Sequence, residues 1–362
     1  MTRAGADPVS RALRNPRALP GWTLSEWDAL VRQARRANLL SRVAVDLNDL
    51  GVLQSVPAAP RVHLDAALIV AQAQEEAVRR EVAYIRTALT RCGIDIVLLK
   101  GAAYLVAGLP AAQGRVFTDI DILVPEAALA EVEGALMLHG WATTHHNPYD
   151  QRYYRQWMHE LPPLRHITRL TVLDVHHAIL PPTARLKPDS AKLLAASRPI
   201  ESEPRLRVLA PVDMVLHSAT HLFHNEDLSS GLRDVADLDS LLRDFGREPA
   251  FWRELTGRAS ELDLARPLYY GLRYAQHFLE TPVPPETLRA AEIGRPARWL
   301  QRAMDALFAR GLQPDHPDLG DRLTPLARQL LYVRAHWLRM PPLLLARHLT
   351  LKALRRDEEQ TT

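Results

Sequence analysis

Cysteine is almost absent from this 362-residue chain, because Cys92 is the only one. A single thiol cannot form an internal disulfide or a metal site built from several thiolates. Long apolar runs are also missing: no stretch reaches eighteen apolar residues, so we expect no membrane-spanning segment. The first residues, MTRAGADPVSRALRNPRALPGW, hold no apolar segment of signal-peptide length. We therefore expect a cytoplasmic protein.

Charge of one sign is not in large excess either. The chain has 45 Lys and Arg residues against 42 Asp and Glu residues, which gives a formal net charge of +3. A near-neutral chain without a basic stripe is not typical of a protein that binds a long nucleic acid. The composition is 47% hydrophobic and 24% charged, as in ordinary globular proteins, and the length leaves room for two or three domains.

The most informative stretch contains two acidic residues in an alternating pattern. Residues 118–124 read TDIDILV, and successive side chains of an extended chain point to opposite faces. Asp119 and Asp121 therefore share one face, while Ile120 and Ile122 point into a core. Two neighbouring carboxylates repel each other unless a cation lies between them. An oxygen-preferring divalent cation, Mg²⁺ (or Mn²⁺), is the expected partner.

A glycine turn precedes this acidic stretch. The apolar run at 96–99 ends at Lys100 and Gly101, and a short helix is expected from Ala102 onward. Free N–H groups and the positive end of a helix favour phosphate binding at such a turn. A phosphate site beside a pair of aspartates indicates phosphoryl or nucleotidyl transfer.

Three motifs together resemble a known family. They are LLKGAAYL at 98–105, R-x-x-x-D-I-D-I-L-V at 115–124 and L-D-V-H at 173–176. The combination resembles the nucleotidyltransferase superfamily with the polymerase-β-type fold, and more narrowly its uncharacterised bacterial nucleotidyltransferase family. Two features depart from the superfamily pattern. Ala102 stands where many members have Ser or Gly, and the segment from Gly101 to Asp119 is longer than in minimal members.

The resemblance implies an α+β fold, with a small mixed β-sheet core flanked by N-terminal and C-terminal helical segments. We expect a disordered N-terminus at 1–20, an N-terminal helical segment at 21–85, the nucleotidyltransferase core at 86–180, a C-terminal helical domain at 205–350 and a polar tail at 351–362. Within the core, residues 170–176 alternate again and predict an antiparallel strand beside the Asp119 strand.

The expected catalytic and metal-binding residues are Asp119, Asp121 and Asp174. The resemblance implies that Asp119 and Asp121 hold the Mg²⁺ of the nucleotide and that Asp174 is the third acidic residue of the superfamily. Asp174 is expected either to share a second Mg²⁺ with the other two or to act as a general base.

Six further residues are candidates for binding the nucleotide: Lys100, Gly101, Ala102, Arg115, His176 and Arg233. Lys100 is expected to reach a phosphate or an acidic neighbour. Arg115 is expected to contact the triphosphate or the acceptor, or to be a solvated loop residue. His176 shares a face with Asp174, so it orients that residue, contacts a phosphate or packs in the core. The alternative for Arg233 is a helix–helix ion pair.

A histidine cluster offers a rival metal site. His217 and His221 are four residues apart on an expected helix and therefore face the same side, with His224 close by. No Glu follows His217 as the H-E-x-x-H motif requires. The favoured alternative is that these histidines, with Asp234 and Asp237, line a cleft between the helical domain and the core.

Two other segments remain open in function. Residues 149–159 are aromatic and basic and would either stack a base or a sugar or form a mobile cover on the sheet. Residues 336–356 are basic and amphipathic and would either lie on an anionic membrane or pack on their own domain.

The sequence therefore predicts a Mg²⁺-dependent nucleotidyltransferase. It would move a nucleoside monophosphate from a nucleoside triphosphate, with ATP the expected donor, to an acceptor hydroxyl or phosphate and release pyrophosphate. The acceptor is open among a small molecule, a peptide or protein, and a tRNA end. The alternatives are phosphoryl or glycosyl transfer on the same fold and a non-catalytic nucleotide-binding or interaction protein.

Overall fold

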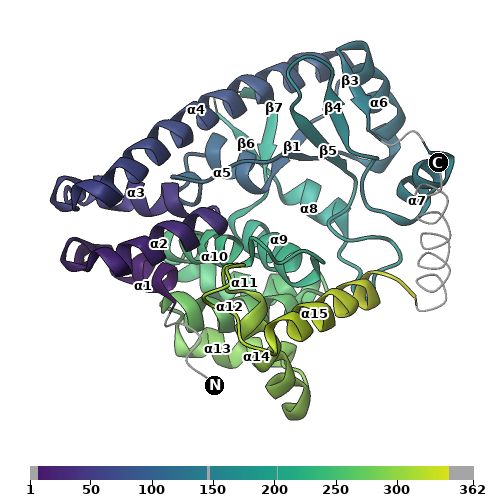
Figure 1. Cartoon of the computed structure of the whole chain (residues 1–362). Coiled ribbons are helices and arrows are strands. Elements are labelled where there is room, and N and C mark those ends of the chain that lie inside the picture. The colour runs from purple at the N-terminus through teal and green to yellow at the C-terminus, as the bar shows by residue number, and fades with distance from the viewer. Residues whose placement is uncertain (1–6, 145–146, 202, 342–362) are drawn as a thin grey trace, which may run out of the picture.

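The computed structural model describes residues 7–144, 147–201 and 203–341 and shows an α+β protein (Figure 1). Seven short strands form one mixed sheet, and helices precede and follow it in the chain. The strands are β1 (Ile96–Leu99), β2 (Ile120–Leu123), β3 (Trp141–Thr143), β4 (Leu164–His166), β5 (Val172–His176), β6 (Arg198–Ile200) and β7 (Glu203–Val208). The expected fold class is confirmed.

The sheet has the strand order β3-β4-β5-β2-β1-β7-β6, so β5, β2 and β1 lie in its middle. β1 pairs with β2 in antiparallel fashion and with β7 in parallel fashion. β2 and β5 are parallel, so the expected antiparallel pairing of the 170–176 strand is wrong. Alternation shows which face a side chain occupies, but it carries no information about strand direction.

Four α-helices precede the sheet. They are α1 (Pro8–Arg14), α2 (Leu24–Arg36), α3 (Leu40–Asp49) and α4 (Ala58–Leu89), with 3-10 helices at Pro16–Gly21, Leu53–Ser55 and Thr90–Cys92. A capping box between Thr23 and Glu26 starts α2. The long helix α4 contacts α2 and α3 as well as α5 and α6, and in Figure 1 it joins the first helices to the sheet.

The first helices correct the expected disorder of residues 1–20 for residues 7–20, and residues 1–6 lie outside the described residues. From Asp7 onward the chain is helical, and the Asp7 side chain accepts a hydrogen bond from the Ser10 amide at 2.8 Å. Val9, Ala12 and Leu19 are fully or almost fully buried in a hydrophobic cluster with α2 and α12. The composition rich in Pro, Arg and Ala suggested disorder, but three apolar side chains are enough to pack this segment onto the helices.

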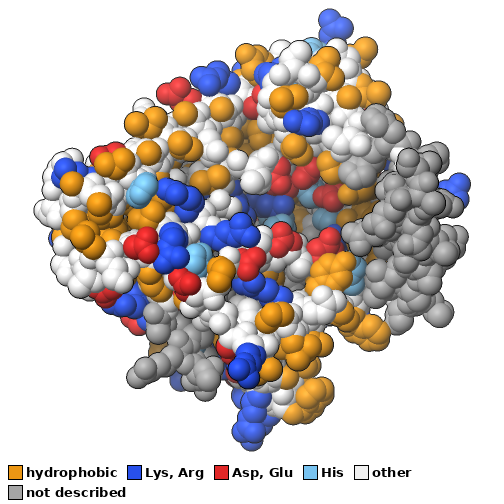
Figure 2. All heavy atoms as spheres, in the orientation of Figure 1, with side chains coloured by type: hydrophobic (Ala, Val, Ile, Leu, Met, Phe, Trp, Pro, Cys, Tyr) orange, Lys and Arg blue, Asp and Glu red, His pale blue; other side chains and the backbone are white. Residues whose placement is uncertain are grey.

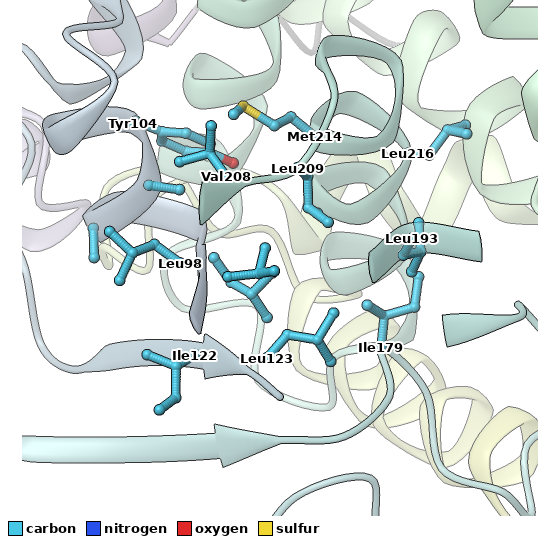
Figure 3. Packing of buried hydrophobic residues seen from close by; sticks show 14 of the residues in the cluster. Leu98, Tyr104, Ile122, Leu123, Ile179, Leu193, Val208, Leu209, Met214 and Leu216 are labelled. Carbon is cyan, nitrogen blue, oxygen red and sulfur yellow. The ribbon is translucent and has the colours of Figure 1, made fainter. Parts of the chain in front are cut away.

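Short helices connect the strands. They are α5 (Lys100–Val106), α6 (Leu129–Leu138), α7 (Pro148–Trp157) and α8 (Ser190–Ala196), with 3-10 helices at Pro110–Ala112 and Glu126–Ala128. The segment at 149–159, for which a mobile cover was one expectation, is therefore mostly helical. All four residues of β1 and all four of β2 are buried. Figure 3 shows Leu98, Leu123 and Leu209 in the cluster that these strands form with the neighbouring helices.

The C-terminal half is helical. It comprises α9 (Pro211–His224), α10 (Gly231–Phe245), α11 (Pro249–Glu261), α12 (Ala265–Leu279), α13 (Pro285–Ala291), α14 (Arg298–Gly311) and α15 (Thr324–Arg339), with a 3-10 helix at Glu292–Gly294. The expected boundary at residue 205 falls inside β7, which belongs to the sheet. The core therefore extends past the expected end at residue 180.

Two expectations concern the last residues of the chain. The polar tail at 351–362 and most of the basic segment at 336–356 lie outside the described residues. Within the part of the chain that the structure describes, none of the helices combines the length and the apolar character that crossing a membrane requires.

Candidate active site

Three aspartates come together at the middle of the sheet. The parallel register of β2 and β5 places Asp121 opposite Asp174, and Asp119 immediately precedes β2. One carboxylate oxygen from each of the three lies within 4.8 Å of the other two. Asp121 is only 3% exposed, whereas Asp119 and Asp174 are half-buried. The alternating pattern thus placed Asp119 and Asp121 together, and the strand pairing adds Asp174.

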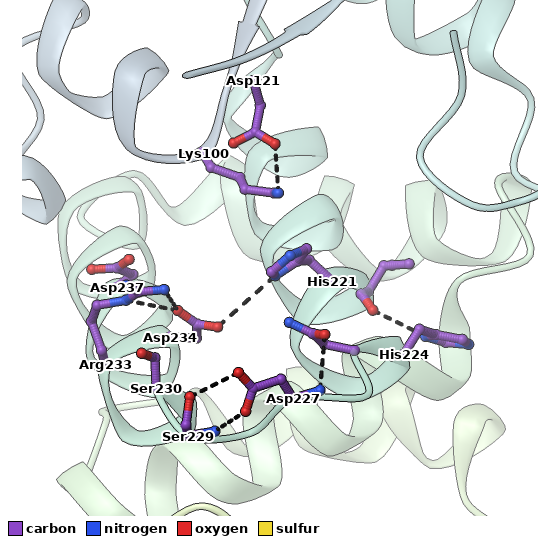
Figure 4. A network of polar contacts seen from close by, with 12 residues as sticks. Lys100, Asp121, His221, His224, Asp227, Ser229, Ser230, Arg233, Asp234 and Asp237 are labelled. Atoms are coloured by element: carbon purple, nitrogen blue, oxygen red, sulfur yellow. Dashed lines mark hydrogen bonds and ion pairs between the residues drawn. The ribbon is translucent and has the colours of Figure 1, made fainter. Parts of the chain in front are cut away.

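Lys100 supplies the nearest positive charge. It directly follows Leu99, which pairs with Asp121, and its Nζ donates a hydrogen bond to Asp121 Oδ1 at 2.7 Å (Figure 4). Lys100 has a φ of 46°, a value that non-glycine residues rarely adopt, at the turn from β1 into α5. Of the two expected partners, an acidic neighbour is therefore the one that the structure shows.

His176 also contacts Asp121. Its Nε2 lies 3.0 Å from Asp121 Oδ1, and its Nδ1 lies 3.2 Å from Glu160 Oε2. Burial lowers the pKa of His176, but the hydrogen bond to Asp121 and the charge of Glu160 outweigh burial and raise the pKa above its ordinary value. Burial in turn raises the pKa of Asp121, but Lys100 and His176 outweigh it and hold that pKa well below its usual range.

Asp174 differs from Asp121 in that it makes no ion pair with the described residues. Burial, and then the negative charges of Asp121 and Glu160, raise the pKa of Asp174 to about 7. Its Oδ1 is buried, and among the described residues it has no hydrogen-bond partner. Such an atom is suited to accept a proton or to bind a cation, because an unpaired buried oxygen costs free energy.

Two cavities adjoin these groups, and Lys100, Asp119, His221 and Asn225 line both. The first has a volume of about 400 Å³, and the second has about 260 Å³. Figure 2 shows acidic and histidine side chains gathered in a hollow on this face of the molecule. The first cavity is also lined by residues from α9, α10 and the loop between them, namely Ser218, Asp227, Ser229, Ser230, Arg233, Asp234 and Asp237.

Arg115 is buried rather than solvated. Its Nε donates to Asp237 Oδ2 on α10 at 2.8 Å, and the residue contributes to the wall of the first cavity. Gly101 packs against the Arg115 guanidinium, since a Cβ at this position would lie 2.2 Å from Arg115 Nη1. Gly101 and Ala102 are both buried and are not among the lining residues of either cavity. Their contact with a phosphate stays a prediction.

The comparisons with known proteins agree with this geometry. A family model described as an uncharacterised nucleotidyltransferase matches residues 23–280, which is more than half of the chain. The chain belongs to this nucleotidyltransferase family. The match confirms the resemblance seen in the motifs and supports a transferase activity, nucleotidyl transfer in general. No match was found among curated proteins or among solved structures.

In this member of the family the histidines of α9 line the second cavity, as the sequence suggested. His217 is 4% exposed, and burial, and then the charge of Lys100, lower its pKa to about 3. His221 Nδ1 lies 3.9 Å from Asp234, which pairs with Arg233 (Figure 4). Arg233 thus makes an ion pair and lines the first cavity, and its side chain is partly exposed there.

The three aspartates fit a divalent cation. They offer three carboxylates, the donor type that Mg²⁺ and Mn²⁺ prefer. The buried, unpartnered Oδ1 of Asp174 is an atom that a cation would satisfy. The sequence did not single out Glu160, which faces His176 from the segment between α7 and β4. That segment has no periodic pattern, and the pairing across to β5 that positions Glu160 is long-range.

Proposed function

We propose that this protein is a Mg²⁺-dependent nucleotidyltransferase. An acceptor oxygen would attack the α-phosphate of a nucleoside triphosphate, with ATP the first candidate, to form a nucleotidyl product and release pyrophosphate. The observation that carries the proposal is the convergence of Asp119, Asp121 and Asp174. The buried Oδ1 of Asp174 has no hydrogen-bond partner in the part of the chain that the structure describes.

Each acidic residue has a role in this proposal. Asp119, Asp121 and Asp174 would hold Mg²⁺ (or Mn²⁺), which when bound neutralises the charge of the triphosphate. As the alternative to this third ligand position, Asp174 would take the proton from the acceptor hydroxyl, since in the metal-free protein burial and its acidic neighbours raise its pKa to about 7. His176 orients Asp121 through the hydrogen bond from its Nε2.

The two cavities divide the substrates. The first and larger cavity receives the triphosphate, because Lys100, Arg115 and Arg233 line it. The second cavity receives the acceptor, and its walls include Asp174, where the proton is taken. A volume of about 260 Å³ suits a small molecule, a side chain of a peptide or protein, or the end of a tRNA.

The first test measures the thermal stability of the protein with Mg²⁺ and each of the four ribonucleoside triphosphates. A ligand at about 100 times its Kd stabilises a protein by roughly 2.7 kcal/mol. We expect a Mg²⁺-dependent rise in Tm with one nucleotide in the wild type and little or none in Asp119→Asn. Asp65→Asn, a change to an exposed carboxylate on α4, is the matched control and keeps the rise.

Labelled nucleotides then identify the reaction. Transfer of label from the α-phosphate to an acceptor, with release of pyrophosphate, supports nucleotidyl transfer. Transfer from the γ-phosphate shows phosphoryl transfer instead. A rise in Tm without turnover on any acceptor class favours a nucleotide-binding protein, and no rise with any nucleotide contradicts the proposal.

A further inference from the structure

A second group of side chains with metal-binding atoms lies beside the aspartates. It consists of His159, Glu160 and His176, whose ligand atoms all lie within 4.8 Å of one another. Glu160 Oε2 is 3.2 Å from His176 Nδ1 and 4.0 Å from His159 Nε2. All three residues line the second cavity.

Paired backbone holds these residues in place. Glu160 and His176 form an antiparallel β-bridge, so their side chains are neighbours by register. The Leu161 amide donates to the Val175 carbonyl at 2.9 Å, and the His177 amide donates to the His159 carbonyl at 2.9 Å. The spacing of the three side chains is therefore set by the fold, as a preorganised ligand site requires.

His159 is a mostly buried residue whose ring has few polar contacts. Its side chain is 14% exposed, and Nδ1 is buried without a hydrogen-bond partner among the described residues. The 4.0 Å distance from Nε2 to Glu160 is too long for a hydrogen bond. Among the described residues, Nε2 therefore has no hydrogen bond either, and this nitrogen, which lies on the side of Glu160, is available to bind an ion in the second cavity.

His176 has the orientation typical of a metal ligand. Its Nε2 donates to Asp121 Oδ1 at 3.0 Å, which directs Nδ1 toward Glu160. Histidines that bind metals usually donate their other ring N–H to a carboxylate or a carbonyl, which fixes the tautomer and the ring. Nδ1 and Glu160 Oε2 are 3.2 Å apart, and a cation between them would bind Nδ1 in its deprotonated form.

We propose that His159, Glu160 and His176 bind a divalent transition-metal ion of the Zn²⁺ type, separate from the Mg²⁺ site of the three aspartates. Two imidazoles and one carboxylate match the preferences of Zn²⁺, whereas Mg²⁺ favours oxygen ligands alone. Three protein ligands leave a coordination position open toward the second cavity, as in catalytic zinc sites. This inference does not depend on nucleotidyl transfer, because the ion binds without nucleotide.

The test titrates Zn²⁺ into the tag-free chain by calorimetry, with Mg²⁺ in excess and no nucleotide. We expect one Zn²⁺ per wild-type chain and at least 100-fold weaker binding in both His159→Gln and Glu160→Gln. The matched control is His177→Gln, since His177 directly follows the cluster and contacts the Met158 carbonyl instead. It should bind Zn²⁺ as the wild type does. Circular dichroism establishes that each variant is folded.

X-ray absorption of the Zn²⁺-loaded wild type gives a readout that needs no variant. Scattering from two imidazole rings supports the proposed site. The proposal would be overturned if the wild type bound no Zn²⁺ or if the scattering showed no imidazole. It would also be overturned if Asp119→Asn lost Zn²⁺ binding while His159→Gln kept it. A Mg²⁺–nucleotide rise in Tm is measured separately, so the two proposals succeed or fail independently.

Discussion

Gly101 has a packing role in the structure that the sequence did not indicate. The turn after β1 suggested that a glycine lets a phosphate approach the backbone. In the structure the space beside Gly101 is filled by Arg115, whose guanidinium carbon would lie 2.8 Å from an added Cβ. That guanidinium has no free room, because it is buried and paired with Asp237.

Gly101→Ala should therefore lower the free energy of unfolding. The added methyl group displaces Arg115 from its ion pair, and such overpacking costs about 1–3 kcal/mol. Gly134→Ala on α6 is the control, since nothing lies within 4 Å of its added Cβ, and helix propensity predicts a gain of roughly 0.5–1 kcal/mol. Urea unfolding at neutral pH measures both. Equal stabilities of the two variants would contradict the packing argument.

The residues that the sequence revealed are those with local patterns. Asp119 and Asp121 stand out because they alternate with apolar residues, and Asp174 and His176 do so in the same way. Glu160 has no such pattern, and its place beside His176 depends on a β-bridge between segments that are not adjacent in the chain. Local periodicity predicts which side chains of a strand share a face, but it does not predict which distant segments the strand pairs with.

At the scale of elements, one buried carboxylate joins three separate segments. Asp237 on α10 accepts a hydrogen bond from Arg42 on α3 at 3.2 Å and another from Arg115, between α5 and β2, at 2.8 Å. Arg42 also donates to the Ala111 carbonyl at 2.6 Å. This network fixes the wall of the first cavity where the N-terminal helices, the core and the C-terminal helices meet.

Asp237→Asn should destabilise the protein strongly, because two buried guanidinium groups lose their counter-charge. Removing one partner of a buried ion pair costs about 3–5 kcal/mol. Asp244→Asn on the same helix removes a surface pair with Arg247 and should cost no more than roughly 0.5 kcal/mol. Denaturant unfolding of the two variants compares these losses. A cost below 1 kcal/mol for Asp237→Asn would show that the network does not hold the elements together.

The sequence predicted elements better than it predicted their pairing. The strands β2 and β5 were expected from the alternating patterns at 118–124 and 170–176. β7 was missed, because its sequence, EPRLRV, is half polar, and it becomes a strand through parallel pairing with β1. Tertiary contact decides the structure of such short polar segments more than their own propensity does.

At the scale of the whole molecule, helix α9 connects the two hydrophobic clusters. Val215 and Leu216 belong to the cluster around the sheet, and Leu222 and Phe223 belong to the cluster of the helices. The histidines of α9 face the second cavity between these two parts. Protonation of these histidines therefore affects the free energy of unfolding of the whole protein.

The buried histidines of α9 should lower the free energy of unfolding in acid. Burial, and then the charge of Arg334, lower the pKa of His224 to about 4, and His217 is held near 3. In the unfolded chain a histidine has a pKa of about 6.5, so between that pH and about pH 4 the unfolded state binds more protons. The stability that these neutral histidines provide is complete above pH 6.5 and is lost as the pH falls through this window.

The loss can be assigned to one residue by comparing wild type with His224→Gln. From pH 7.5 to pH 5, His224 should account for about 2 kcal/mol of lost unfolding free energy, at about 1.4 kcal/mol per pH unit. Two carboxyl groups, Asp174 with a pKa of about 7 and Asp46 with a pKa of about 6, add to the unfolding free energy as the pH falls. This gain is the same in wild type and in His224→Gln. Urea unfolding at the two pH values should therefore show a loss about 2 kcal/mol smaller in His224→Gln. The exposed His139 gives the control His139→Gln, which should lose as much as wild type, and an equal loss in all three proteins would contradict the assignment.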